Sequence, residues 1–429
     1  MSAFTRCAAA VLLAALAAGC GSRAEAPPDT PRRGPAYRAA RPSAAGARHG
    51  RAGARPAAPG PARPFTLVAA GDVIPAHPAA LVTAQDDAPV DGGYDFRPML
   101  RGVRPVIHGA GLALCHLAAP LGPLDGPFTG FPTLQAPPQV ATALKATGFD
   151  ACATASHHVL DQGVAGVRHT LDVLDTVGLR HTGSARGAAE AARPVLLGAP
   201  GGARVAQLSY TEGTEGTEGT DGAKGPAGVP WAANLLDPRK VVADARAARR
   251  AGADIVVVSA HWGTEYRAAP DARQLRLARA LTAARTDGRP DIDLIVGSHA
   301  HTPQPYEKVD GSGAGRPQDG RAAADDVHAS GTWVAYGLGD LIGGSTHDER
   351  GNMSTAARFT FTPPATQGGR WEITKAEFVP LWWDARAGRV IDVNQAIKAG
   401  RRDLEPLRHR IRGIVLSRGA HQAGLVMGR

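Results

Sequence analysis

The chain has 429 residues, of which 43% are hydrophobic, 20% charged and 5% aromatic, and its formal net charge is +9. This length and hydrophobic content suffice for a large core in one or two domains. Residues 21–64 contain nine Arg against two acidic residues, so that without them and Arg6 the remainder carries a net charge of only +1. The charge therefore lies in an N-terminal segment whose one aromatic residue is Tyr37, and we expect no nucleic-acid partner.

Residues 1–20 have the features of a secretory signal peptide. Arg6 precedes an apolar run that is too short to span a bilayer comfortably. The run ends in Ala-Ala-Gly-Cys, which resembles the lipobox of bacterial lipoproteins, where Cys20 would become the lipidated first residue of the mature protein. The alternative is an ordinary secretory signal that contains Cys20 by chance. Both interpretations predict an extracytoplasmic protein, either anchored to the cell membrane as a lipoprotein or secreted.

Residues 21–64 are rich in Pro, Ala, Gly and Arg and nearly without bulky apolar side chains, so we expect a disordered tether. Its positive charge suits an anionic membrane or wall polymer. Beyond the tether the chain has two cysteines, Cys115 and Cys152, each within an apolar, strand-like run. Buried small hydrophobic residues are the favoured interpretation of both, although the compartment would permit a disulfide.

From residue 65 the predicted elements alternate between strands and helices. Apolar runs predict strands at 65–72, 109–121, 149–158, 203–210, 254–262 and 291–301. Apolar residues at helical spacing, with Pro, Asp or Gly at the ends, predict helices at 136–148, 164–178, 239–251 and 271–285. Three later strands have no long helix between them and predict a partly antiparallel second sheet, at 332–340, 358–363 and 372–382. Taken together, the pattern predicts an α/β fold of packed layers.

Two further segments have distinctive compositions. Residues 211–222 form the tandem repeat TEGTEGTEGTDG, for which a mobile loop is favoured over a calcium site, because the Asp and Asn pattern of known calcium loops is missing. Residues 391–429 place apolar side chains such as Ile397 and Ile411 among Arg and Lys. This predicts a C-terminal amphipathic helix docked on the folded domain, expected at 65–390, in preference to a helix on a membrane surface.

Histidine and aspartate recur at the C-terminal ends of the predicted strands, where open α/β sheets bind their ligands. Because alternate residues of an extended chain point to one side, His299 and His301 are expected to direct both imidazoles at one volume. Desolvating so many imidazoles requires a compensating partner. Mixed imidazole and carboxylate donors suit one or two divalent ions of Mn, Zn or Fe. The expected metal ligands are Asp72, His116, His157, His261, His299 and His301.

The order of these motifs resembles the CapA family over about 65–342. The most specific matches are HWGTEY at 261–266 and GSHAHTPQP at 297–305, accompanied by GDV, SHHVLDQG and YGLGDLI. Members of this family are poly-γ-glutamate capsule synthesis proteins with the metallophosphatase, or calcineurin-like phosphoesterase, fold. The resemblance implies a four-layer αββα sandwich with a dinuclear-type site. It also implies that His158 is a catalytic acid or phosphate contact and that Asp161 orients it.

The chain departs from the family pattern at three positions. His116-Leu117-Ala118 stands where the family has Asn-Leu-Glu, so that the usual carboxylate is missing. His157 replaces an Asn of the family's Asn-Asn-His, and Asp340 replaces the last Asn of a YSLGN-type motif. One outcome is a more imidazole-rich site, in which His116 and His157 restore lost donors. The other is a mononuclear or catalytically weak site, and the sequence leaves both open.

The expected function is that of an extracytoplasmic metal-dependent hydrolase or transferase in the synthesis or processing of an anionic envelope polymer such as poly-γ-glutamate. Its substrate would be a phosphoester or an amide, its membrane contact a lipid anchor, and its partners membrane synthase proteins. The polymer follows from the resemblance alone. The alternative is a non-catalytic, membrane-anchored binding or assembly protein with a degenerate metal site, which the missing carboxylate at Ala118 motivates.

Overall fold

The structure is a computed structural model that describes residues 62–90, 93–214, 228–310, 331–343, 349–366 and 368–428. All of these residues belong to one compact unit, Ala58–Arg429. The predicted signal peptide, the tether up to residue 61 and residues 215–222 of the repeat lie outside the described residues. Within the described ranges, no helix is both long enough and apolar enough to cross a bilayer.

The larger of two sheets contains nine strands in the order β16-β15-β14-β1-β2-β3-β4, with β13 beside β1 and β17 beside β15. β1 to β4 and β13 run parallel. β14 is antiparallel to β1 and β15, β15 is antiparallel to β16, and β17 is parallel to β15. Its strands are β1 (Phe65–Val73), β2 (Leu112–Leu117), β3 (Ala151–Ala153), β4 (Arg180–Thr182), β13 (Asp340–Ile342), β14 (Met353–Thr362), β15 (Glu372–Asp384), β16 (Arg389–Asp392) and β17 (Leu425–Met427).

The smaller sheet contains six strands in the order β11-β12-β10-β7-β6-β5. The four central strands are parallel, and the edge strands β5 and β11 are antiparallel to their neighbours. A separate hairpin pairs β8 (Arg285–Thr286) with β9 (Arg289–Pro290). The strands of the smaller sheet are β5 (Val195–Gly198), β6 (Arg204–Thr211), β7 (Ile255–His261), β10 (Leu294–Ser298), β11 (Tyr306–Val309) and β12 (Thr332–Ala335).

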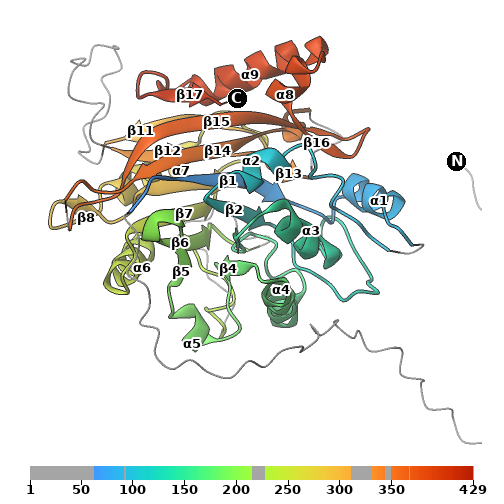
Figure 1. Cartoon of the computed structure of the whole chain (residues 1–429). Helices are drawn as coiled ribbons and strands as arrows, with labels where there is room; N and C mark the ends of the chain where they lie inside the picture. The colour runs from blue at the N-terminus through green and yellow to red at the C-terminus, as the bar shows by residue number, and fades with distance from the viewer. Residues whose placement is uncertain are drawn as a thin grey trace, which may run out of the picture. The chain divides into compact units, whose positions relative to one another are not determined.

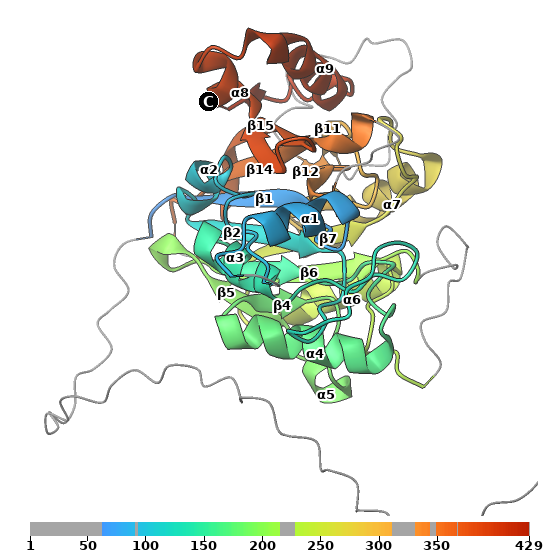
Figure 2. The ribbon, with the colours of Figure 1, turned by 90° about the vertical axis from the view of Figure 1, so that its right-hand side faces the viewer.

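Helices cover the outer faces of the two stacked sheets (Figures 1 and 2). One apolar cluster joins α1 to α4 to the larger sheet, a second lies between the sheets, and a third joins α6 and α7 to the smaller sheet. These layers confirm the predicted four-layer αββα sandwich. The helices are α1 (Pro78–Asp86), α2 (Arg104–His108), α3 (Gln139–Thr147), α4 (Gly163–Val177), α5 (Ala188–Ala191), α6 (Pro238–Arg250), α7 (Ala272–Thr282), α8 (Val393–Lys398), α9 (Glu405–Leu416) and the 3-10 turns η1 (Pro200–Gly202), η2 (Glu349–Asn352) and η3 (Arg402–Leu404).

The helix ends follow local chemistry that the sequence contains. The Asp237 side chain accepts hydrogen bonds from two backbone N–H groups at the start of α6. Asp271 and Gln274 form a reciprocal capping box at the start of α7. α4 ends at Gly178, whose φ of 73° lies in the left-handed region that favours glycine. After these helices the chain returns to the sheets: α4 is followed by β4, α6 by β7, and α7 by the segment that leads to β10.

The sequence predicted that the later strands form a second sheet. They do not form a sheet of their own, but join the two sheets already described. β14 and β15 extend the larger sheet on the far side of β1, whereas β12 pairs with β10 and β11 in the smaller sheet. The prediction of antiparallel pairing holds for β14, β15 and β16. The sheet to which each of these strands belongs differs from the prediction, because it depends on partner strands that are distant in the sequence.

The segment 391–429 is also different from the single helix that was expected. α8 and α9 are separate helices beside β15 (Figures 1 and 2), and the chain turns between them at Gly400, whose φ is 110°. The segment then ends in β17, which pairs in parallel with β15. Ile411 and Val415 of α9 are fully buried in the cluster between the sheets. Packing therefore holds this segment on the domain.

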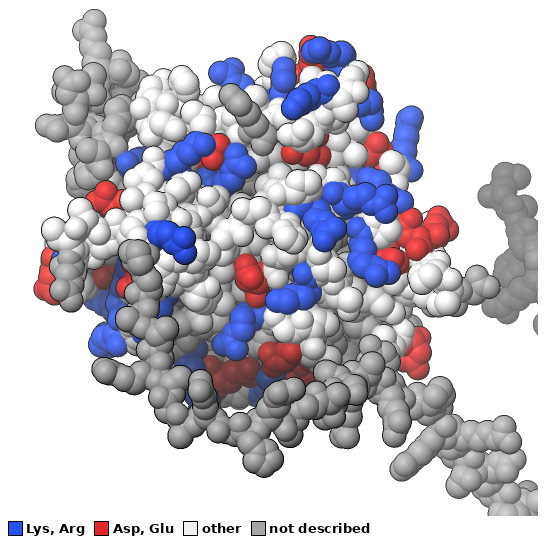
Figure 3. Space-filling view, viewed as in Figure 1, with Lys and Arg blue, Asp and Glu red and all other residues white. Residues whose placement is uncertain are grey.

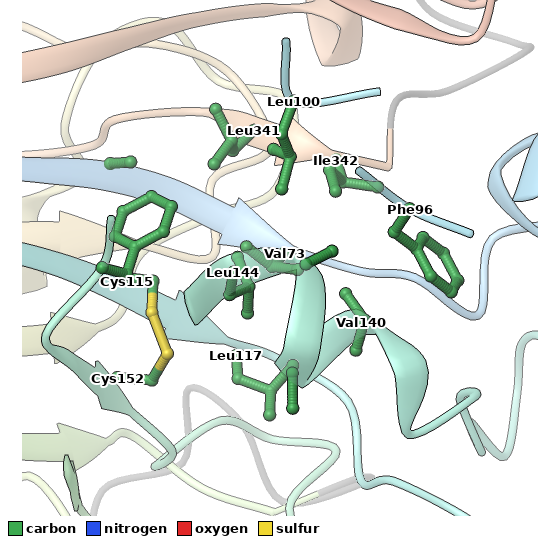
Figure 4. Packing of buried hydrophobic residues seen from close by; sticks show 14 of the residues in the cluster. Val73, Phe96, Leu100, Cys115, Leu117, Val140, Leu144, Cys152, Leu341 and Ile342 are labelled. Carbon is green, nitrogen blue, oxygen red and sulfur yellow. A yellow bond between two sulfur atoms is a disulfide. The ribbon is translucent and has the colours of Figure 1, made fainter. Parts of the chain in front are cut away.

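Cys115 and Cys152 form a disulfide, which differs from the unpaired buried thiols that the sequence favoured (Figure 4). The residues are direct neighbours on the parallel strands β2 and β3, with their Cα atoms 4.4 Å apart. Their local sequences gave no signal, because the pairing depends on the register of two strands. The bond lies within the apolar cluster that covers the outer face of the larger sheet.

The first residues of the TEG repeat belong to the folded domain and not to the mobile loop that was expected. Thr211 is the last residue of β6 and is buried. Glu212 is also buried, and its Oε2 accepts a hydrogen bond from the backbone N–H of Gly263, 3.0 Å away. The repeat thus starts beside the end of β7.

Candidate metal centre

The predicted site residues gather where parallel strands of both sheets end. In the larger sheet, Asp72 at the end of β1 is paired with His116 of β2 and with Asp340 of β13. In the smaller sheet, His261 at the end of β7 is paired with Ser298 of β10. The register of the two sheets thus brings together side chains that are up to 268 positions apart in the chain.

Close backbone approach at this point depends on glycine. A Cβ atom on Gly71 would collide with the carbonyl oxygen of Gly339, and Gly339 itself has a φ of 76°. The Asp72 N–H donates to this carbonyl oxygen over 2.9 Å. The paired glycines therefore allow Asp340 to lie beside Asp72.

Three buried histidines from three different segments face a common point. His157 Nδ1 lies 2.7 Å from His261 Nε2, and the ring centroid of His299 lies 4.7 Å from the centroids of both other rings. One donor nitrogen from each of the three residues lies within 4.8 Å of the other two. We refer to His157, His261 and His299 as the imidazole trio.

Burial keeps the imidazole trio neutral. Desolvation, assisted by the neighbouring imidazoles, lowers the pKa of His157 and lowers the pKa of His261 well below its ordinary value. The same causes lower the pKa of His299 to about 4. His261 Nδ1 lies 3.0 Å from Ser298 Oγ, and we assign its proton to that nitrogen, so that Nε2 presents a lone pair toward His157.

His299 provides the structural test of whether a cation fits. Its Nδ1 is buried and has no hydrogen-bond partner among the described residues. A buried polar atom without a partner costs about 1–3 kcal/mol. Three neutral imidazoles are the donor set of Zn²⁺ sites and also suit Mn and Fe. The trio therefore fits a divalent cation, which would supply the missing partner.

His116 and Asp72 form a second, tightly connected group. His116 Nδ1 contacts Asp72 Oδ1, and His116 Nε2 lies 3.0 Å from the carbonyl oxygen of Ala155. Asp72 Oδ2 accepts a hydrogen bond from the backbone N–H of His299 over 2.8 Å. Although burial acts to raise it, the pKa of Asp72 is lowered by His116, His301 and this N–H. Both nitrogens of His116 thus face acceptors.

His301 is not a member of the trio and is surrounded by carboxylates. Its Nδ1 is 3.0 Å from both carboxylate oxygens of Asp340, and its Nε2 is 3.7 Å from Glu265 Oε1. Although burial opposes it, these carboxylates raise the pKa of His301 well above its ordinary value. Candidate cation-binding groups also occur here, with Glu265, His299 and His301 in one and Asp72, His301 and Asp340 in another.

His299 and His301 each place a donor nitrogen within 4.8 Å of the other, as expected, but the backbone there is not the extended strand that the prediction assumed. β10 ends at Ser298, and both histidines have positive φ, 83° for His299 and 55° for His301. Their ring centroids are 6.1 Å apart, because the left-handed backbone turns His299 toward the trio and His301 toward Asp340. Non-glycine residues rarely adopt this conformation, and the sequence gave no signal of it.

His158 and Asp161 lie beside the trio in the turn after β3. His158 Nδ1 is 2.8 Å from Asp161 Oδ2, which also accepts the backbone N–H of Leu134 over 2.6 Å. This is the contact that the predicted orienting role of Asp161 requires. The ring of His158 lies next to that of His157, with a centroid separation of 4.0 Å. The catalytic and ligand roles of all these residues remain predictions.

Sequence reasoning missed two acidic residues at the site. Asp340 was treated as a departure from a motif, although it ends a strand-like run as Asp72 does. Glu265 lies within HWGTEY, four residues after His261, and the nearby imidazole of His301 lowers the pKa of its carboxyl group. An acidic residue within a histidine motif was the available signal.

Comparisons with known proteins relate most of this domain to one family. Residues 66–345 match the family model of the bacterial capsule synthesis protein PGA_cap. The PGA biosynthesis protein CapA of Bacillus subtilis is 31% identical over 179 residues, 42% of this chain and 44% of that protein. The capsule biosynthesis protein CapA of Bacillus anthracis is 29% identical over 174 residues, 41% of this chain and 40% of that protein. The chain thus matches less than half the length of these curated relatives.

Two solved structures align with most of this chain at low sequence identity. A 5'-nucleotidase precursor from Thermus thermophilus aligns with a TM-score of 0.41 and 17% identity, over 81% of this chain and 59% of that one. The calcineurin-like phosphoesterase YfkN from Bacillus subtilis aligns with a TM-score of 0.40 and 14% identity, over 81% of this chain and all of that one. On the strength of the family model, the chain belongs to the PGA_cap family of bacterial capsule synthesis proteins.

Proposed function

We propose that the protein is an extracytoplasmic, metal-dependent hydrolase or transferase that acts on phosphoester or amide bonds of an anionic envelope polymer. The observation that carries the proposal is the buried Nδ1 of His299, which has no hydrogen-bond partner among the described residues and lies within a trio of neutral imidazoles. The CapA relatives are named for PGA and capsule biosynthesis, which supports a polymer such as poly-γ-glutamate.

His157, His261 and His299 would hold the cation, of Zn, Mn or Fe. When bound, this ion supplies a Lewis acid for a substrate oxygen and lowers the pKa of a coordinated water. The chain's own groups would hold and orient the reactants. Asp161 orients His158 through Nδ1, so that Nε2 would donate a proton to the leaving group.

The same contacts favour one cation per chain. Both oxygens of Asp72 are engaged, by His116 and by the backbone N–H of His299. Both oxygens of Asp340 lie 3.0 Å from His301 Nδ1. Ala118 stands at the position where the family has a Glu. The backbone oxygen of Ala118 accepts a hydrogen bond from the Ser156 hydroxyl, and both residues are buried. We therefore assign positioning of Asp72 to His116. The proposed site is mononuclear, and His157 contributes one of its three imidazoles.

A second candidate function is that of a non-catalytic binding or assembly protein on the same fold. The absence of a carboxylate at Ala118 and the internal engagement of Asp72 favour it, because a degenerate centre would bind a cation without turnover. Membrane synthase partners belong to both candidates and are likewise part of the proposal.

Metal content tests the centre itself. After loading with Zn, Mn or Fe and dialysis, elemental analysis of the wild type is expected to give about one ion per chain. His299→Ala is expected to lose this ion. The matched control is His409→Ala, because His409 is an exposed residue of α9. A wild type that retains none of the three metals would remove the basis of the proposal.

An activity screen separates the two candidate functions. Phosphodiester and γ-glutamyl amide substrates are assayed with each metal. Turnover that His299→Ala abolishes and His409→Ala preserves supports the hydrolase or transferase. Stoichiometric metal uptake without turnover on either substrate class supports the assembly protein.

A further inference from the structure

A cavity of about 350 Å³ lies outside the metal centre and is lined by arginine. Arg97, Arg101 and Arg104 contribute three guanidinium groups, and Leu100 and Thr147 belong to its apolar and buried wall. Three successive hydrogen-bonded turns precede α2, so that the three arginines recur on one side of the chain. All three are exposed to solvent.

The cavity lies on the outer, helix-covered side of the larger sheet, between the end of α3 and the segment that leads into α2. The residues that line it include none of the imidazole trio, and Met99 beside it accepts a hydrogen bond from the backbone N–H of Val390 in β16. A ligand in the arginine cavity is therefore bound by groups other than those of the trio.

Two of the three arginines have no acidic partner among the described residues. Asp95 pairs with Arg97 through three hydrogen bonds of 2.8–2.9 Å and is the one acidic residue in the wall. Arg101 and Arg104 form no ion pair and no side-chain hydrogen bond with any other described residue. The cavity wall thus carries a net charge of +2, although the chain beyond residue 64 carries only +1 in total. Figure 3 shows Lys and Arg gathered on the face that carries α2 and α3.

We propose that this arginine cavity binds carboxylate groups of an extended polyanionic chain, as a non-catalytic subsite that holds the polymer on the domain. The inference rests on the proposed function, which supplies a polymer of that charge. The planar guanidinium fork matches a carboxylate in bidentate geometry, and an unpaired Arg forms this contact without breaking an existing ion pair. Arg97, fixed by Asp95, forms the rigid border of the subsite.

Binding of fluorescently labelled poly-γ-glutamate to the full chain tests the proposal. We expect the charge-reversal variant R101E/R104E to bind on the order of tenfold more weakly than the wild type at about 0.1 M salt, since two exposed ion pairs are replaced by repulsion. The matched control is R410E/R412E, which reverses two exposed charges on α9. The Arg-rich segment 21–64 is common to all three proteins, so the difference reports the cavity.

Two further arms fix the ligand chemistry. Polyphosphate and vesicles of anionic phospholipid replace the polycarboxylate in the same assay. If the R101E/R104E substitution weakens binding to polyphosphate or to the vesicles more than it weakens binding to poly-γ-glutamate, the carboxylate assignment is overturned. Equal affinity of the three proteins for poly-γ-glutamate overturns the subsite.

Metal content separates this inference from the proposed function. R101E/R104E is expected to retain the same metal per chain as the wild type, and polymer binding is measured with and without a chelator. Failure of the wild type to take up metal contradicts the proposed centre. If R101E/R104E binds poly-γ-glutamate tenfold more weakly than the wild type in the presence of chelator, the subsite is supported, whether or not the wild type takes up metal.

Discussion

Asp161 serves two groups with one carboxylate oxygen. Oδ2 accepts both the Nδ1–H of His158 and the backbone N–H of Leu134, so that the imidazole and the loop before α3 share one anchor. The ring of His158 is therefore oriented by a residue that is not among the proposed ligands of the cation. This separates proton transfer from metal binding and makes the two functions testable independently.

Replacement of this carboxylate tests the orienting role. Asp161→Asn keeps the size of the side chain but removes its charge and one acceptor, and we expect kcat to fall by roughly 10- to 100-fold. Metal content is expected to stay at the wild-type value, because His158 lies outside the trio. Steady-state kinetics and elemental analysis of the same preparation check both statements. Unchanged kcat, or parallel loss of metal, would contradict an orienting role.

At this scale, the sequence could place the site but not its inner contacts. Asp72 and His261 were predicted at strand ends, and they do come together: ligand atoms of Asp72, His116 and His261 lie within 4.8 Å of one another, although β1 and β7 belong to different sheets. The contact of Asp340 with His301 could not be derived, because it depends on β13 adding to β1 across 268 positions of chain. Left-handed backbone at His299 was equally out of reach, since it is set by tertiary contacts.

The disulfide joins two elements that carry site residues. β2 ends in the segment that carries His116, and β3 leads directly to the turn with His157 and His158. The bond between Cys115 and Cys152 fixes these strands one residue before His116, and the Ser156 hydroxyl adds a second link to the end of β2. The crosslink therefore stabilises the frame on which the trio is assembled.

Removal of both cysteines is expected to destabilise the domain. The bond closes a loop with a sequence separation of 37 residues, for which loop-closure entropy predicts a contribution of about 3–4 kcal/mol. C115A/C152A should lower the free energy of unfolding by this order, measured by denaturant titration. Reductant should destabilise the wild type by a similar amount and leave the double variant unaffected. A reductant effect of equal size on both proteins would exclude the bond as the cause.

Elements with strong local signals were predicted well. The Asp-capped starts of α6 and α7 and the glycine end of α4 agree with the expected positions within a few residues, because capping is a local interaction. β3 is shorter than its apolar run, since only three residues find a partner on β2. The C-terminal helices and β17 depend on β15 as a template, and periodicity alone could not reveal that pairing.

At the scale of the whole molecule, the distribution of charge and the disulfide bear on our proposal of an extracytoplasmic location. The excess of Arg lies in residues 21–64, whereas the rest of the chain is nearly neutral. A structural disulfide is typical of proteins outside the reducing cytoplasm. Both features agree with our proposal of an extracytoplasmic domain on a basic tether, which an anionic surface would attract.

Lipidation at Cys20 would complete this arrangement, and its loss should release the protein. A lipid chain together with a basic segment gives two membrane signals, whereas the basic segment alone binds weakly and in a salt-dependent way. In a bacterial host, the wild type is expected in the membrane pellet and Cys20→Ala in the salt-washed soluble or secreted fraction. The control is Cys7→Ala, which changes a cysteine within the predicted signal and should remain in the pellet. Retention of Cys20→Ala in washed membranes at the wild-type level, with the signal peptide removed as judged by the mass of the variant, would contradict a lipid anchor at Cys20.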